Sequence, residues 1–249
     1  MVRQIYTDLF SFLDENNIDY QLEQQIIRFN DFDFSLYLVL DSNDNTVTEF
    51  EKLRQTEQNK NNRFLIFIWF DLWELKPQII LSKIKHLLSL SIKKHARKTK
   101  VKPVNKIESI QFYTQNHLNQ PLLGYKRFGL YINNELIALA SFAKKRKFRD
   151  DTYSSELLQF STLNGIHING GLSKLVKHFY LTYPVSTIMT YIDLDWTAGN
   201  KFKTVGFLPV EIKSPIYFTL NNQTKLRELN HKPSSIFNMG SIKSILIID

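Results

Sequence analysis

Hydrophobic positions recur along the first ninety residues with the spacings of helices and strands. Ile5, Leu9, Phe12 and Leu13 are three or four residues apart and share one face of a predicted helix. Uninterrupted or alternating apolar runs predict strands, and periodic runs predict two further helices: strands over 20–29, 32–40 and 64–70, and helices around 48–58 and 77–90. This order predicts a small α/β unit.

The pattern changes after a basic connector, residues 93–105, so a domain boundary is expected near residue 100. The second part reads as a helix, a hairpin turning at Asn133-Asn134, and further strands and helices. The predicted elements are a helix over 107–116, strands over 127–132, 136–142 and 157–163, a helix from Gly170, a strand over 188–193, a short segment from Gly199, strands over 207–212 and 216–220, and an edge strand over 242–248. We therefore expect an α/β (α+β) protein with domains 1–100 and 101–249.

Composition excludes several kinds of site and several classes of protein. The 249 residues include 19 Phe and 11 Tyr, enough for a substantial core, and no Cys, which excludes disulfides, thiolate metal sites and a cysteine nucleophile. The first 17 residues lack the apolar stretch of a signal peptide, and the longest apolar run, 64–70, is too short to cross a bilayer. A soluble, cytoplasmic protein without a membrane partner is expected.

Positive charge is concentrated in two clusters within a chain of formal net charge +8. The first cluster, in residues 93–106, has seven Lys or Arg and no acid; the second has five in the six residues 144–149. They are either solvated faces or contacts for a polyanion such as DNA, whose phosphates release counterions when cations bind. The predicted DNA-binding residues are Lys93, Lys94, Arg97, Lys98, Lys100, Lys102, Lys144, Lys145, Arg146, Lys147 and Arg149.

A possible cofactor cradle lies where Gly170 and Gly171 open a helix, with Ser173 and Lys174 in its first turn. Backbone N–H groups at a helix N-terminus attract anions without help from side chains. The alternative is an ordinary connecting turn, since a Gly-Gly pair before a helix is a weak signal.

Three further residues are candidates for catalysis. Asp193 ends a predicted strand and Asp195 follows two residues later; in a shared pocket one of the two carboxyls would have a raised pKa. His117 follows a helix end and could act as an acid, a base or, with Asp193, a metal ligand. The alternatives are a helix N-cap for Asp193 and a surface or capping histidine for His117.

Residues from about 105 to 220 resemble a GNAT-like domain of phage proteins related to the Mom-type DNA-modification proteins. The resemblance rests on ordered short pieces: Asn116-His117-Leu118, Gly129-Leu130-Tyr131, Glu135-Leu136-Ile137-Ala138, Ser141-Phe142, Glu156-Leu157-Leu158, Gly170-Gly171-Leu172-Ser173-Lys174-Leu175, Tyr191-Ile192-Asp193, Trp196, Gly199 and Gly206-Phe207. It implies a sheet that opens between its central strands, an acyl-CoA-like donor and a nucleobase amine as acceptor. Leu172, Gln159 and the Leu194-Asp195 pair depart from the pattern of these relatives.

The preceding part resembles a very-short-patch-repair or PD-(D/E)XK nuclease-like domain, as in homing-endonuclease-like phage proteins. The matching pieces are the strand around Ile66, Asp71-Leu72-Trp73, the helix from Pro77 and Ala96-Arg97-Lys98. Such a nuclease needs two carboxylates and a lysine around a metal, and only Asp33 and Asp41 lie near the expected strands. The nuclease centre is therefore expected to be degenerate, leaving a DNA-docking scaffold.

Three hypotheses follow from these features. The first is a DNA-modification transferase of GNAT type with DNA held by the basic clusters. The second is a non-catalytic DNA-binding or adaptor protein, suggested by Gln159, Leu172 and Asp195. The third is a residual homing-type endonuclease, against which the incomplete set of carboxylates and lysine argues.

Overall fold

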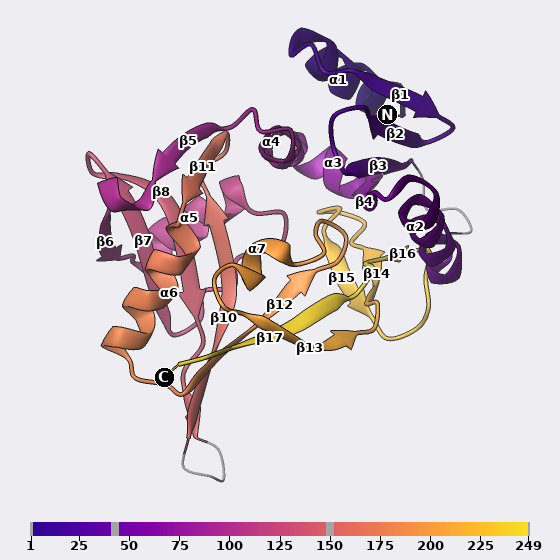
Figure 1. Ribbon diagram of the computed structural model, residues 1–249. Coiled ribbons are helices and arrows are strands. Elements are labelled where there is room, and N and C mark those ends of the chain that lie inside the picture. Colours follow the sequence, from indigo (N-terminus) through magenta and orange to yellow (C-terminus); the bar gives the residue numbers. More distant parts are fainter. Residues whose placement is uncertain (1, 41–44, 148–151, 249) are drawn as a thin grey trace. The chain divides into compact units, whose positions relative to one another are not determined.

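Helices and strands alternate along the chain, and the predicted α/β class is confirmed (Figure 1). The computed structural model describes residues 2–40, 45–147 and 152–248. These residues form two compact units, the first from residues 1–80, 192–199 and 212–242 and the second from residues 81–191, 200–211 and 243–249. The expected domains 1–100 and 101–249 stay a prediction.

The first unit contains a sheet in the order β1-β2-β3-β4, in which β3 and β4 are parallel and the other neighbours antiparallel. The predicted strand over 20–29 is instead a hairpin, because Gln24, with φ 56°, turns the chain. The elements of this part are α1 (Val2–Glu15), β1 (Tyr20–Glu23), β2 (Ile26–Phe29), β3 (Phe34–Val39), α2 (Val47–Asn61), β4 (Phe64–Trp69) and α3 (Phe70–Leu75).

Aromatic side chains dominate one core of the first unit. Phe50 of α2 stacks on Phe67 of β4 with ring centroids 4.8 Å apart, and Phe237 packs edge-on against Phe50 and Trp69. Phe237 belongs to a three-stranded sheet, of which only the strand near residues 216–220 is predicted from the sequence. Its strands are β14 (Tyr217–Leu220), β15 (Arg227–Asn230) and β16 (Ile236–Phe237).

The second unit is built on a larger mixed sheet with the strand order β13-β17-β12-β10-β8-β7-β6. β17 lies between β12 and β13, so the prediction of an edge strand near residues 242–248 is wrong in its position. The strands are β6 (Lys100–Pro103), β7 (Lys126–Ile132), β8 (Glu135–Phe142), β9 (Arg146–Lys147), β10 (Tyr153–Thr162), β12 (Thr187–Asp193), β13 (Leu208–Lys213) and β17 (Ser241–Ile247), and β12, β13 and β17 run from one unit into the other.

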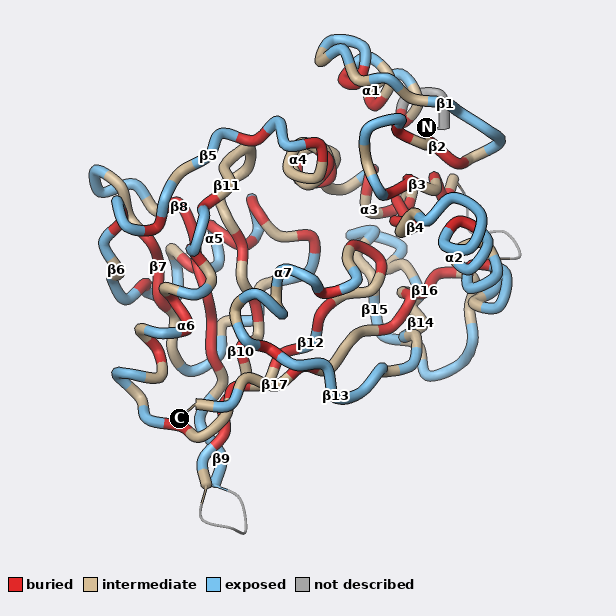
Figure 2. Tube along the Cα trace, in the orientation of Figure 1, coloured by how far each residue is buried: buried red, intermediate tan, exposed pale blue. Residues whose placement is uncertain are grey.

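Helix α6 (Gly171–Thr182) contacts β7 and β8 of this sheet and buries Leu175, Val176 and Phe179 against it. Phe179 stacks on Phe142 of β8 with centroids 4.0 Å apart. Figure 2 shows the buried stretches running along β8 and β10. The remaining helices are α4 (Pro77–Leu87), α5 (Lys106–Asn116) and the short α7 (Asn200–Lys203). Within the described residues, no helix has both the length and the apolar composition needed to cross a membrane.

The expected basic connector is an ordered part of the second unit. Residues Ile92–His95 form β5, which pairs in parallel with β11 (Ile166–Asn169), a strand that the sequence did not predict. A short 3-10 helix, Ala96–Lys98, follows, and β6 then pairs with β7. Ala96 is buried in the core of this unit, so the cations beside it are displayed on a folded scaffold.

Candidate functional site

The sheet of the second unit opens between β10 and β12. These parallel strands pair over only three rows, Ser154 with Thr187, Ser155 with Ile188 and Glu156 with Met189, although both continue beyond them. Where the pairing stops, the Thr190 hydroxyl donates to the Leu157 carbonyl at 3.0 Å in place of a backbone N–H. This is the opening that the resemblance to GNAT-like domains implies.

A β-bulge lies at the same point of β10. Leu157 faces Phe142 of β8 and Gln159 faces Ser141, so Leu158 is an extra residue without a partner row. A bulge bends and twists its strand and redirects the side chains beyond it. It therefore helps to turn β10 away from β12 after Glu156.

Glu156 is the last paired residue of β10 at this opening, and its side chain is half-buried. Burial raises the pKa of its carboxyl, and Arg146 opposes this effect. A carboxylate with a raised pKa is a better base near neutral pH than an ordinary one. From the sequence, Glu156 stands out only as part of the Glu156-Leu157-Leu158 motif; its value as a base depends on burial, which the motif does not reveal.

The predicted cofactor cradle begins at Gly170, which adopts φ 73° and caps α6 without a side-chain hydrogen bond. A Cβ at Gly170 would meet only Ala96, at 3.7 Å, so the position is open. Gly171 is buried and Ser173 is exposed. Backbone N–H groups here could hold an anion, as expected for a phosphate-bearing cofactor.

Lys174, the predicted cation of that cradle, is bonded within the protein. Its Nζ donates to the carbonyls of Ala96 and Thr99 at 2.8 and 2.6 Å and to the Thr99 hydroxyl at 3.2 Å. Leu172 is half-buried and packs against the core of the second unit. The side chain of Lys174 therefore fastens α6 to the basic segment, and its role in cofactor binding stays a prediction.

His117 caps the end of α5, where its N–H donates to the Tyr113 carbonyl at 2.8 Å. Its Nδ1 lies 3.1 Å from the Asn119 N–H and 3.4 Å from Gln159 Nε2. Gln159 is buried and also holds the backbone of Gln120 and Leu122. These bonds give His117 a place in the loop after α5, and its catalytic role stays a prediction.

Asp193 and Asp195 lie in the first unit, at and just beyond the end of β12. Asp193 Oδ1 accepts the Asp195 N–H at 2.9 Å, and the buried Asp195 carboxylate accepts the Met239 N–H at 2.8 Å. Burial, then the neighbouring Asp193, raises the pKa of Asp195 to about 8. The two carboxyls are close, as expected; convergence of Asp193 with His117, which belongs to the second unit, stays a prediction.

The described basic residues of the two clusters are nearly all exposed. In the first cluster, Lys93, Arg97, Lys98, Lys100 and Lys102 are exposed and Lys94 is half-buried. In the second, Lys144, Lys145, Arg146 and Lys147 are exposed, whereas Arg149 lies outside the described residues, as does Asp41 of the degenerate nuclease centre. The described residues include no group of three or more His, Asp or Glu side chains that could hold a metal ion.

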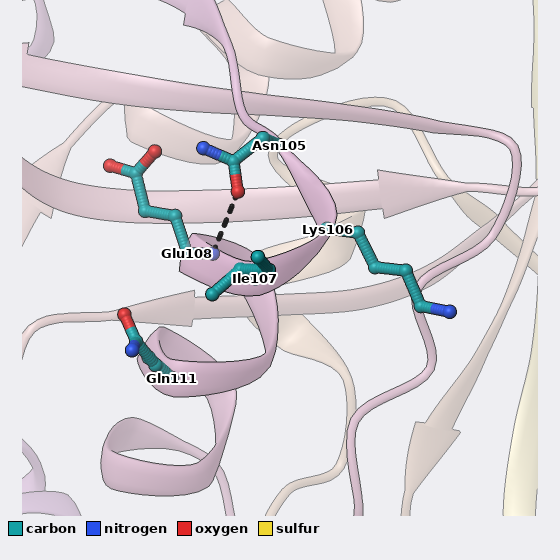
Figure 3. A pocket seen from close by; sticks show the side chains of 5 residues that line it. All are labelled: Asn105, Lys106, Ile107, Glu108 and Gln111. Carbon is teal, nitrogen blue, oxygen red and sulfur yellow. Dashed lines mark hydrogen bonds between the residues drawn. The ribbon is translucent and has the colours of Figure 1, made fainter.

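One surface hollow, of about 570 Å³, lies at the N-terminus of α5 (Figure 3). It is lined by Asn105, Lys106, Ile107, Glu108 and Gln111. Asn105 Oδ1 accepts the Glu108 N–H at 2.9 Å, the bond drawn in the figure, and so caps the helix. None of the residues predicted for catalysis or cofactor binding lines this hollow.

Comparison with known proteins adds a likeness of fold. No protein-family model and no curated protein matches the sequence. The solved structure of the NatC complex bound to Gag peptide and CoA is similar at 13% identity and a TM-score of 0.40, covering 61% of this chain and 99% of that one. A GNAT family acetyltransferase from Elizabethkingia anophelis with acetyl-CoA bound gives 10% identity, a TM-score of 0.40 and the same coverage. A histone acetyltransferase HPA2-related structure from Corynebacterium glutamicum gives 11% identity and a TM-score of 0.41, covering 61% of this chain and 98% of that one. Scores this low carry no argument about activity.

Proposed function

We propose that this protein is a GNAT-type transferase that moves an acyl group from an acyl-CoA-like thioester to a nucleobase amine of DNA. The observation that carries the proposal is the opening between β10 and β12, where pairing stops after three rows beside a bulge. Gly170, the N-cap of α6, makes no side-chain hydrogen bond to the helix, so the backbone N–H groups of this N-terminus are open to an anion. The order of motifs from Gly170 to Phe207 supports the same assignment.

The residues of the chain would divide the work as follows. Backbone N–H groups after Gly170 would hold the phosphates of the donor, whose thioester supplies an activated carbonyl and a thiolate leaving group. The half-buried Glu156 carboxylate would take the proton that the attacking amine loses as its N–C bond forms. Asp193, which ends β12, stays a predicted catalytic residue.

Mass spectrometry of nucleosides tests the transferase. Plasmid DNA incubated with the protein and acetyl-CoA should yield a nucleoside heavier by one acetyl group. Glu156→Gln should lower the yield by at least tenfold, because it removes the base and keeps the shape. Glu135→Gln, an exposed change on β8, serves as the matched control and should leave the yield unchanged. Unmodified DNA under these conditions, with acetyl-CoA bound or not, would contradict the proposal.

DNA binding by the first basic cluster is tested separately through its salt dependence. If about five cations meet phosphates, log K should fall with log salt at a slope of about −4 to −5. Replacing Arg97 and Lys98 by Gln should reduce the slope by about 2. Replacing Lys52 and Lys60, two exposed cations of α2, should not change it. Equal slopes for both double variants would identify the cluster as a solvated face.

The second candidate function is a non-catalytic DNA-binding or adaptor protein. The internal bonds of Lys174 favour it, because that ammonium is engaged with Ala96 and Thr99. An adaptor should keep the salt-dependent DNA affinity and show no binding of acetyl-CoA by calorimetry. A calorimetric signal that disappears in Gly170→Asp, which places a negative charge at the N-terminus of α6, would decide for the transferase.

A further inference from the structure

Three basic side chains from distant parts of the sequence meet within the second unit. His86 lies on α4, His167 on β11 and Lys201 on α7. The two imidazole rings are 4.4 Å apart between centroids with 32° between their planes, and Lys201 Nζ contacts His86 Nε2. No motif in the sequence marks these residues, which are separated by 81 and 34 positions.

The two histidines are held together by the backbone around them. The Gly165 N–H, at the turn before β11, donates to the Ser82 hydroxyl of α4 at 2.8 Å. β11 pairs with β5 over four residues, which places His167 opposite Lys93. The Asn169 side chain is hydrogen-bonded to His167. The imidazoles therefore lie side by side because the backbone fixes α4 against β11.

The charged groups that act on these rings are all cations. Burial, then Lys201, His167 and Lys83, lowers the pKa of His86 to about 3. Burial, then Lys201, lowers the pKa of His167 as well, and Lys93 acts in the same direction. Both rings are thus neutral at pH 7 and lie beside several ammonium groups. The described residues around the two rings therefore give a local excess of positive charge, which a bound anion would neutralise.

We propose that His86, His167 and Lys201 form a binding site for a phosphate-type dianion, such as inorganic phosphate or the terminal phosphate of a small phosphomonoester. Lys201 is exposed, and the two histidines are half-buried. The Lys201 ammonium and the single N–H that each neutral imidazole keeps are donors suited to phosphate oxygens, and ionic hydrogen bonds are the stronger kind. The three groups meet at one point, which fits a compact dianion better than the extended backbone of DNA.

This site is independent of the proposed transferase, and its test measures binding alone. The full-length protein with labelled histidines is titrated with inorganic phosphate and followed by NMR of the imidazole rings, assigned with His86→Gln and His167→Gln. The chain has six histidines, so the spectrum contains its own controls. The His86 and His167 signals should move together and saturate at millimolar phosphate, whereas His117 and His178 should stay in place.

Substitutions of Lys201 then test the role of the cation. Lys201→Met should weaken phosphate binding at least tenfold, and Lys201→Arg should largely restore it. Lys203→Met removes an exposed cation from the same helix and should have no effect. The histidine spectrum without phosphate shows whether each variant is folded; if Lys201→Met is not, Lys201→Gln takes its place.

Three outcomes would overturn the site. The first is an equal shift of the His86 and His167 signals with chloride at the same ionic strength, which would show that the rings respond to ionic strength and not to phosphate. The second is an unchanged phosphate affinity in folded Lys201→Met. The third is a response of the two rings to a short DNA duplex at concentrations well below that of phosphate, which would assign them to the phosphodiester backbone. A response to adenosine monophosphate but not to phosphate would support the site and place its ligand among small phosphomonoesters.

Discussion

The two units of this protein differ in where their ionised side chains lie. In the first unit, Arg28 binds the buried Glu57, with Nε 3.1 Å from Oε1, and Arg227 binds the buried Asp71 with bonds of 2.7 and 2.9 Å. In the second unit, the cations of residues 93–102 and 144–147 are mostly exposed, and His86, His167 and Lys201 have cations as their charged neighbours. The first unit thus buries two ion pairs, whereas the second unit exposes most of the cations of its two basic clusters.

This difference separates buried ion pairs, which act within the fold, from exposed cations, which can meet a partner. Burying an ion pair costs desolvation energy that its attraction only partly offsets, so such pairs define an arrangement more than they add stability. Exposed cations contribute little to folding and remain available to an anionic partner. The first unit therefore has the character of a scaffold, and the second has both the basic surfaces and the opening between β10 and β12.

The largest effect is expected when a buried charge of the first unit loses its partner. Glu57→Gln should lower the free energy of unfolding by about 3–5 kcal/mol, because Arg28 remains partly buried without its main counter-charge. Glu23→Gln removes the other carboxylate on Arg28, which is 72% exposed, and should cost at most about 1 kcal/mol. Urea unfolding followed by tryptophan fluorescence reports on this unit, since Trp69, Trp73 and Trp196 all lie in it. Equal losses for both variants would contradict the contrast between buried and exposed charge.

A smaller loss is expected from Lys174, a cation of the second unit whose ammonium is bonded inward through three contacts. Lys174→Met removes three hydrogen bonds to Ala96 and Thr99 and should cost roughly 1.5–3 kcal/mol. Lys177→Met, exposed on the same helix, should change stability by less than about 0.5 kcal/mol. Hydrogen exchange of residues 92–103 measures the effect, and unaltered protection in Lys174→Met would show that this contact does not fasten the segment.

The smallest change in the free energy of unfolding, counted per pH unit, is the pH dependence that Asp195 contributes. Its pKa is raised in the folded state, so its contribution to stability is complete below about pH 4 and is lost as the pH rises towards 8. Between pH 5 and 8 the free energy of unfolding should fall as the pH rises, by roughly 1 kcal/mol per pH unit at most. Asp195→Asn keeps an acceptor for the Met239 N–H and should flatten this slope. A slope that is the same in both proteins would show that Asp195 is ionised when folded.

Local periodicity predicted much of the fold, and pairing between distant segments accounts for most of what it missed. The helix with Ile5 and Leu9 and the hairpin at Asn133-Asn134 follow from spacing and turn residues alone. β11 was missed because Ile166–Asn169 is short and is a strand only through pairing with β5, some 74 residues earlier. The basic segment was interpreted as a connector because its many lysines are typical of an exposed segment, whereas Ala96 enters the core from a short 3-10 helix that no apolar pattern marks.

Features of the candidate site could be predicted from the sequence only where they are formed by residues close together in the chain. The Gly170-Gly171 turn and the adjacent carboxylates Asp193 and Asp195 were identified from such spacing. The other features depend on burial and on contacts with distant residues. Burial raises the pKa of the Glu156 carboxyl, and the Lys174 ammonium donates to the Thr99 carbonyl. The cluster of His86, His167 and Lys201 needs three elements to meet, which no short-range pattern encodes.

The position of β17 has a consequence for the order of folding. Residues Ser241–Ile247 lie between β12 and β13, which precede them in the sequence. During synthesis, β12 and β13 are therefore made before the strand that joins them, and their facing edges have no partner until it emerges. Unpaired strand edges are sites of wrong pairing and aggregation. The residues between β13 and β17, which contain β14, β15 and β16, lengthen this interval. The sheet of the second unit is therefore expected to close late and to depend on chaperones more than the sheet β1-β2-β3-β4 does.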